Sequence, residues 1–200
     1  DNYSSSKASA EIIFNSYFKS YHMKNYLTSV TTRAGNVIGG GDFKKDRIVP
    51  DVIKALKSNR KIFIRNPNAT RPWQHVLEPL SGYLILGHKL MKKELSSKIK
   101  PNWNFGPLRK NCKKVIQIVK LLNINWSKKP NKIIIKRSDK FYESQLLSLN
   151  INKAKKELSW QPRLSLNETI KLTTNWYKAY FKKKDMSKVS IDQINFFIKK

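Results

Sequence analysis

The first 42 residues pass from a helical pattern to a strand pattern and then to a glycine-rich loop. Apolar residues recur at helical spacing over 8–21, with Glu11 and Lys19 expected on the solvent side of that helix. The β-branched run 27–33 predicts a strand, and three consecutive glycines follow it at 39–41. Helix and strand in alternation indicate an α/β fold, in which helices cover a sheet.

The alternation continues through the rest of the chain. Spacing and composition predict helices at 47–56, 77–91 and 111–122, and strands at 61–64, 103–105 and 132–136. The sequence Ser165-x-x-Glu168 is a capping box that opens one more helix. The tail 185–200 has an amphipathic pattern, which fits docking on the protein body, covering a partner or lying on a membrane surface.

Tyr3 and Lys7 stand four positions apart at the start of the first predicted helix, so their side chains share one helix face. A tyrosine hydroxyl has an ordinary pKa of about 10, so it becomes a useful general base only when its phenolate is stabilised. One fixed cation at about 5 Å contributes roughly 3 kcal/mol of that stabilisation at an effective dielectric of 20. The spacing therefore predicts a pair able to take a proton from a substrate hydroxyl, although it also occurs in helices where the tyrosine only packs.

Composition argues against several other classes of protein. A single cysteine, Cys112, leaves no internal disulfide or thiolate metal cluster, and its place in the predicted 111–122 helix indicates a packing role. The three histidines, at positions 22, 75 and 88, lack the spacing of a zinc site, so we expect no metal. No apolar run approaches the ~20 residues that cross a bilayer, and no secretion leader is visible. These features predict a cytoplasmic protein without membrane contact.

The chain is strongly basic, with 41 lysine and arginine residues against 13 aspartate and glutamate residues. Such a balance is typical of nucleic-acid-binding proteins. The positive residues, however, are mostly lysines scattered along the chain, without a helix-turn-helix, zinc-finger or RNP-type pattern. We therefore predict no nucleic-acid partner, and keep a basic nucleic-acid-binding protein as the alternative from another class.

Five segments together resemble the extended short-chain dehydrogenase/reductases, and within them the NAD-dependent nucleotide-sugar 4,6-dehydratases. They are YSSSKASAE (3–11), RAGNVIGGGDFKKDRIVPD (33–51), RNPNATRPWQHVLEPLSGYL (65–84), NWNFGP (102–107) and ELSWQPR (157–163). The segments occur in the family's order and span most of the chain. The resemblance implies the C-terminal part of a doubly wound Rossmann-type parallel sheet with a smaller α/β substrate-binding lobe.

The resemblance also implies a reaction. The RPWQHVLEPLSGYL segment is most similar to members that dehydrate CDP-glucose to CDP-4-dehydro-6-deoxyglucose, a step of deoxysugar biosynthesis such as that of lipopolysaccharide O-antigen. By this likeness Tyr3 is the catalytic base, Lys7 its ribose-binding and phenolate-stabilising partner, and both contact NAD. In the family, NAD takes hydride from C4, water leaves across C5 and C6, and the hydride returns to C6. Oxidation comes first because a ketone at C4 acidifies the C5 proton.

Substrate residues follow from the same likeness. Asn36 and Arg47 resemble nucleotide-sugar contacts, Arg71 and Asn104 resemble diphosphate ligands, and Arg65 is a candidate for the nucleotide pocket. Arginine suits a diphosphate because its planar fork can satisfy two oxygens at once. The residues for elimination are expected in a segment before Tyr3.

One segment departs from the family pattern. Relatives commonly carry a His-Glu pair before the last strand of the substrate lobe, whereas this chain has Lys-Phe-Tyr-Glu at 140–143. If Glu143 retains the carboxylate role, the histidine function is absent or replaced by Tyr142.

The chain lacks the glycine fingerprint of a dinucleotide-binding turn. No G-x-G-x-x-G or G-x-x-G-x-x-G precedes a strand, and the glycines at 39–41 lead into a charged segment. We therefore expect residues 1–200 to be the C-terminal portion of a longer enzyme, with its substrate-binding lobe interleaved and its N-terminal Rossmann half upstream. No internal boundary is predicted, and this portion alone is expected to be inactive.

Two further expectations depend on the resemblance. Family members pair through a four-helix interface that includes the Y-x-x-x-K helix, which implies a homodimer. A related NAD-dependent epimerase or dehydratase acting on another nucleotide-sugar stays open, because no residue in the sequence is shown to contact cytosine.

Overall fold

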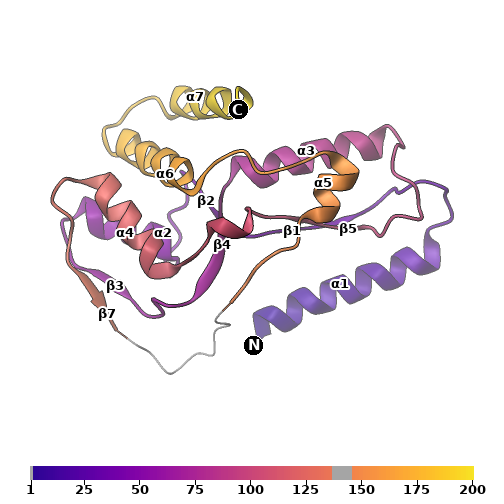
Figure 1. Ribbon diagram of the computed structural model, residues 1–200, viewed down its shortest axis with the longest axis horizontal. Coiled ribbons are helices and arrows are strands. Elements are labelled where there is room, and N and C mark those ends of the chain that lie inside the picture. Colours follow the sequence, from indigo (N-terminus) through magenta and orange to yellow (C-terminus); the bar gives the residue numbers. More distant parts are fainter. Residues whose placement is uncertain (1, 137–145) are drawn as a thin grey trace. The chain divides into compact units, whose positions relative to one another are not determined.

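The computed structural model describes residues 2–136 and 146–200 (Figure 1). The chain forms two compact units, each assembled from separate segments. The first contains Asp1–Ala34, Leu80–Phe105 and Asn150–Gln161, and the second contains Gly35–Pro79, Gly106–Leu149 and Pro162–Lys200. The segment 137–145 lies outside the described residues, so the expectation for Tyr142 and Glu143 stays a prediction.

The first unit is built around a parallel pair of strands. Strand β1 (Thr31–Ala34) pairs with β5 (Asn102–Phe105), with Thr31 opposite Asn102. Three helices accompany this pair: α1 (Asn2–Tyr21), α5 (Asn152–Leu158) and most of α3 (Leu77–Met91). The alternation of apolar and polar residues in β5 buries Trp103 and Phe105 and leaves Asn102 and Asn104 on the other face.

Phe105 is the packing centre of the first unit. Its ring is fully buried and makes edge-to-face contacts with Tyr83 at 5.4 Å and Trp160 at 5.0 Å. Gly82 lies so close that a Cβ atom there would be 2.3 Å from the ring. Burial of an aromatic side chain of this kind contributes about 1.5–3 kcal/mol, so this cluster fixes α3 against β5.

The second unit contains two small sheets among its described residues. In one, β2 (Asn36–Ile38) is parallel to β4 (Thr70–His75), which pairs antiparallel with β6 (Cys112–Lys114). In the other, β3 (Ile62–Ile64) is parallel to β7 (Ile133–Ile135). The helices of this unit are α2 (Ile48–Lys57), α4 (Val115–Trp126), α6 (Leu166–Phe181) and α7 (Met186–Ile198), with the 3-10 turn η1 (Arg109–Asn111). Parallel strands joined through helices confirm the predicted α/β class.

The core of the second unit joins α2, α4 and α6. Val52, Ile53, Ile118, Leu122 and Ile170 are each at most 2% exposed and belong to one continuous apolar cluster. The predicted capping box at the start of α6 is confirmed, since Ser165 accepts a hydrogen bond from the Glu168 N–H and Glu168 accepts one from the Ser165 N–H. These caps satisfy backbone donors that the first helical turn leaves unpaired.

Helix α7, the C-terminal tail, packs on α6. Gln193 Nε2 donates to the Leu172 carbonyl at 2.9 Å, and Trp176 Nε1 donates to Ser190 Oγ at 3.0 Å. Lys200 forms an ion pair with Glu168. Docking on the protein body, one of the alternatives left open for residues 185–200, is therefore confirmed.

Two local predictions are wrong. The helix expected at 111–122 begins only at Val115, because Cys112–Lys114 pair as a strand with β4. Cys112 is therefore a half-buried strand residue. In α1, Glu11 faces the β1–β5 pair instead of solvent, while Ile13 and Tyr17 are 58% and 66% exposed. No helix in the described part of the chain is both long and apolar enough to cross a bilayer.

Candidate active site

Tyr3 and Lys7 lie together in the first turns of α1. The Lys7 ammonium is 5.6 Å from the centroid of the Tyr3 ring, so the two side chains share a helix face as their spacing predicts. Tyr3 is 72% exposed, and its backbone carbonyl accepts a hydrogen bond from Ser6 Oγ at 2.8 Å. The arrangement leaves the phenol accessible to a ligand with a cation beside it.

Glu11, one helical turn after Lys7, anchors α1 to the strand pair. Arg33 Nε and Nη2 donate to the two Glu11 carboxylate oxygens at 2.9 and 2.7 Å. Thr31 Oγ1 and Asn102 Nδ2 donate to Glu11 Oε2, each at 3.1 Å. The hydrogen bonds from Arg33 are the main reason that the pKa of Glu11 is lowered. This network fixes the helix that carries Tyr3 and Lys7.

Asn104 belongs to the same network. Its Oδ1 accepts from Arg33 Nη1 at 3.3 Å, and its Nδ2 donates to the Asn150 carbonyl at 3.2 Å. The orientation of the Asn104 amide is thus tied to Arg33 and, through Arg33, to Glu11. The sequence does not identify Glu11 or Arg33 as site residues. A lone carboxylate in an apolar-rich helix is nevertheless a signal that the carboxylate has a polar partner in the folded protein.

Lys153 supports β5, the strand that carries Asn104. Its ammonium lies 3.4 Å from the centroid of the Trp103 ring and donates to the backbone carbonyls of Lys100 and Asn102. Burial lowers the pKa of Lys153 to about 8. The Lys153 ammonium therefore contacts two carbonyl oxygens and an aromatic ring in place of water, and these contacts hold β5.

Asn36 and Arg71 occupy neighbouring strands in the second unit. Asn36 begins β2 and is in register with Trp73 of β4, while Arg71 lies on β4 opposite Lys113 of β6. Arg71 is only 9% exposed, and its Nη1 donates to the Thr70 carbonyl at 3.0 Å. Burial of a guanidinium requires polar neighbours, so β4 presents Arg71 in a constrained orientation.

Arg47 and Arg65 lie near the start of α2 and the end of β3. Arg47 Nη1 contacts Asp42 Oδ2 at 3.0 Å, and Arg65 Nη2 lies 3.9 Å from Asp46 Oδ1. Both arginine side chains are more than half exposed, at 58% and 61%. Exposed pairs contribute about 0–1 kcal/mol, so an anionic ligand can compete for either guanidinium.

His75 and Glu78 shape the turn from β4 into α3. His75 is 1% exposed, and its Nδ1 accepts from the Leu77 N–H at 3.4 Å. Burial lowers the pKa of His75 to about 4, so the ring is neutral at pH 7. Glu78 accepts from the N–H groups of Arg163 and Leu164 at 2.9 and 2.6 Å, while burial raises its pKa. The hydrogen bonds of His75 and Glu78 therefore hold the turn that links β4, the strand of Arg71, to α3.

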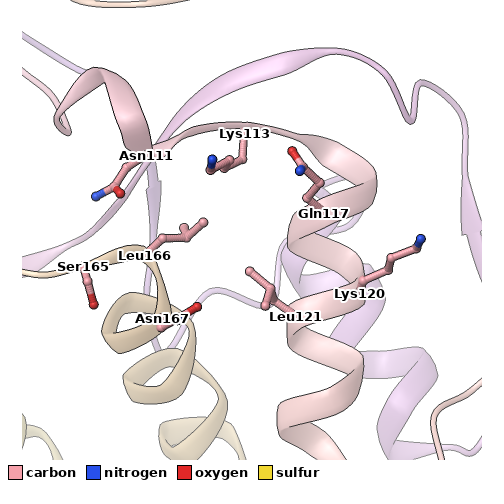
Figure 2. Close-up of a pocket in the computed structure, with 8 residues that line it drawn as sticks. All are labelled: Asn111, Lys113, Gln117, Lys120, Leu121, Ser165, Leu166 and Asn167. Atoms are coloured by element: carbon pink, nitrogen blue, oxygen red, sulfur yellow. The ribbon is translucent and has the colours of Figure 1, made fainter.

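A cavity of about 560 Å³ lies in the second unit between the first turns of α4 and α6 (Figure 2). Leu121 and Leu166 extend into the space between the two helices, and Lys113 and Gln117 lie at its upper edge in Figure 2. Gln117 Oε1 is already used as an acceptor for the Lys114 N–H. None of the predicted site residues is among the residues that line this cavity.

The predicted residues are divided between the two units. Tyr3, Lys7 and Asn104 belong to the first, and the remaining four, Asn36, Arg47, Arg65 and Arg71, belong to the second. Within residues 2–136 and 146–200, no three histidine, cysteine, aspartate or glutamate side chains are grouped as a metal site would require.

Comparison with known proteins gives consistent results. The family described as GDP-mannose 4,6 dehydratase matches residues 1–173. CDP-glucose 4,6-dehydratase of Salmonella typhimurium is 38% identical over 191 residues, which are 93% of this chain and 52% of that protein. The dTDP-D-glucose 4,6-dehydratase of Homo sapiens is 28% identical over 185 residues, which are 90% of this chain and 49% of that protein. The chain thus spans about half the length of the curated relatives it matches.

Solved structures share the fold. A dTDP-glucose 4,6-dehydratase from Bacillus anthracis, solved with NAD, matches with a TM-score of 0.70 and 22% identity, covering 89% of this chain and 52% of that chain. A UDP-glucuronic acid 4-epimerase from Bacillus cereus, solved with UDP-glucuronic acid and NAD, matches with a TM-score of 0.73 and 20% identity, covering 87% and 51%. The sequence match over residues 1–173 and this shared fold show that the chain belongs to the GDP-mannose 4,6-dehydratase family.

Proposed function

We propose that the complete protein is a lyase that dehydrates CDP-glucose to CDP-4-dehydro-6-deoxyglucose with bound NAD. The observation that carries this proposal is the Tyr3–Lys7 pair, whose ammonium lies 5.6 Å from an exposed phenol ring. The choice of CDP-glucose is supported by 38% identity to the Salmonella typhimurium dehydratase over 93% of this chain. The product is an intermediate of deoxysugar biosynthesis, and the synthesis of lipopolysaccharide O-antigen is one process that fits it.

The chain's own residues account for the first proton transfer. Tyr3 accepts the proton of the sugar O4 hydroxyl, and Lys7 stabilises the phenolate that performs this step. When bound, NAD supplies the hydride acceptor at C4 and the hydride donor at C6. An exposed phenol beside an ammonium fits a ribose and a sugar hydroxyl. Hydroxyl groups can accept a hydrogen bond from the ammonium and donate one to the phenolate.

The remaining predicted residues hold the substrate. Arg71 and Asn104 bind the diphosphate, Asn36 and Arg47 contact the nucleotide-sugar, and Arg65 lies at the nucleotide. The constrained Arg71 on β4 supports this role, because a guanidinium held in place loses little freedom when it binds two phosphate oxygens. A net charge of +28 also draws an anionic nucleotide-sugar toward the protein.

The complete protein is further proposed to be a cytoplasmic homodimer that pairs through α1. None of the residues of α1 is buried in the described structure, and Ile12, Ile13 and Tyr17 are 69%, 58% and 66% exposed. Such an apolar helix face is suited to cover by another helix. The single cysteine fits a reducing compartment.

Substrate choice is tested with the complete enzyme and four substrates, CDP-, UDP-, GDP- and dTDP-glucose. The alkaline absorbance of a 4-keto product measures turnover. We expect CDP-glucose to be used with the highest kcat/KM. Equal turnover of all four would defeat the CDP assignment, and turnover of none, with salt-sensitive retention on random DNA, would favour the nucleic-acid-binding alternative.

A further inference from the structure

The loop between β2 and α2 carries Arg47 at its end. Within it, the Lys44 N–H donates to Asp42 Oδ1 at 3.1 Å. Gly41 has φ of +84°, and Asp46, directly before Arg47, has φ of +63°. A left-handed backbone costs most non-glycine residues about 1–2 kcal/mol, and aspartate is one of the few that adopt it readily. Contacts from α6 add to the hold on this loop.

Trp176 of α6 provides one of these contacts. Its indole lies directly against Gly40, where a Cβ atom would be 2.0 Å from Trp176 Cδ2. The indole is itself held, because it stacks on Tyr180 with an interplanar angle of 9° and donates to Ser190 of α7. Gly40 therefore allows the loop backbone to rest on a fixed aromatic surface.

Tyr177, the next residue, provides the second contact. Its side chain is fully buried, and its hydroxyl donates to the Asp42 carbonyl at 2.5 Å. Burial raises the pKa of Tyr177 to about 12, so the hydroxyl keeps its proton as a donor at any physiological pH. Phe43 closes over the Tyr177 ring with an edge-to-face contact at 5.6 Å.

Asp42 connects this anchor to Arg47. Its backbone carbonyl is bound by Tyr177, while its carboxylate contacts the Arg47 guanidinium at 3.0 Å. The Asp42–Arg47 pair is exposed and contributes only about 0–1 kcal/mol, so the direction in which it holds Arg47 depends on where Asp42 lies. The Tyr177 hydroxyl anchors the Asp42 backbone, and the Lys44 N–H contacts its carboxylate, so both help to place that carboxylate.

We propose that Trp176 and Tyr177 are positioning residues that clamp the Gly39–Arg47 loop and thereby orient Arg47 toward the nucleotide-sugar. This inference rests on the proposed function and adds to it a role for α6 and, through Ser190, for α7. The clamp acts on substrate affinity and leaves the Tyr3–Lys7 chemistry unchanged.

The test uses the complete enzyme with the Tyr177→Phe variant, which removes only the anchoring hydroxyl. Loss of one hydrogen bond predicts a KM for CDP-glucose raised roughly fivefold, with kcat within about twofold of the original value. Tyr180→Phe is the matched control, because it removes a hydroxyl from the same helix without touching Asp42. An unchanged KM in Tyr177→Phe, or an equal rise in both variants, would overturn the proposal.

A double-mutant cycle separates positioning from general loosening of the fold. In an Arg47→Ala background, Tyr177→Phe should change KM by less than about twofold, since the residue that it positions is already gone. If the two substitutions instead multiply in their effects, Tyr177 does not act through Arg47 and the proposal is wrong.

A second readout does not require turnover. Trypsin cleaves after Lys44, Lys45 and Arg47, all within the clamped loop. Cleavage at these sites, quantified by mass spectrometry of the folded protein, should be several-fold faster in Tyr177→Phe than in Tyr180→Phe. Equal cleavage rates would overturn the clamp even if the enzyme used no CDP-glucose, whereas absence of turnover with faster cleavage would defeat only the proposed reaction.

Discussion

Glu11 of α1 and Arg33 of β1 form a two-pronged ion pair, with N···O distances of 2.7 and 2.9 Å. The pair joins the helix of Tyr3 and Lys7 to the strand pair that presents Asn104. The position of Tyr3 and Lys7 relative to the strand pair thus depends on the Glu11 carboxylate.

Glu11→Gln should weaken this link. The substitution keeps the side-chain size but removes the charge, so we expect a loss of about 1 kcal/mol in the free energy of unfolding. Because the folded pKa of Glu11 is lowered, its contribution is present above the pKa of the unfolded carboxyl and is lost as the pH falls through the folded value. Urea unfolding at pH 7 and at acid pH checks both effects. Equal stability of Glu11→Gln and the original protein at pH 7 would contradict the anchoring role.

Arg71→Ala should act mainly on substrate binding. Loss of charged hydrogen bonds to a diphosphate predicts a KM raised roughly 10- to 100-fold, with a smaller change in kcat. Arg71→Lys keeps the charge without the planar fork and should recover only part of the affinity. Arg60→Ala is the matched control for net charge, because Arg60 lies in the α2–β3 connection of the same unit. An affinity that Arg71→Ala leaves unchanged would remove this residue from the site.

Titration of His75 should make the protein sensitive to mild acid. The folded pKa is about 4, and the model-compound value of 6.5 applies to the unfolded chain, so the unfolded state binds more protons between these values. Titration of His75 therefore leaves the free energy of unfolding unchanged above pH 6.5. As the pH falls from 6.5 toward 4, that free energy decreases by up to about 3 kcal/mol. Chemical unfolding measured at several pH values should show this slope, and His75→Gln should reduce it while His88→Gln should not. The same slope in His75→Gln would show that another group is responsible.

Local spacing predicts the elements that depend on neighbouring residues. The Tyr3–Lys7 face, the Ser165–Glu168 capping box and the helix 77–91 are all found where the sequence places them. Family resemblance, rather than spacing, supplied the substrate residues. Their roles stay predictions, although hydrogen bonds constrain the Arg71 and Asn104 side chains in the structure.

The errors come from contacts between distant segments. Cys112–Lys114 form a strand because β4, about 40 residues earlier, offers an antiparallel partner, and helical periodicity cannot show such a pairing. Glu11 turns inward because Thr31, Arg33 and Asn102 gather around it after folding. The two units are also invisible in sequence, since each is assembled from separate segments.

The proposed reaction depends most on Tyr3 as the base that takes the O4 proton, with Lys7 stabilising its phenolate. The most direct test is single-turnover kinetics of Tyr3→Phe in the complete enzyme, together with calorimetric binding of CDP-glucose. General-base loss predicts a turnover at least about 100-fold lower, with CDP-glucose affinity within about threefold of the original value. Turnover within about tenfold of the original, with the substrate bound normally, would contradict the claim.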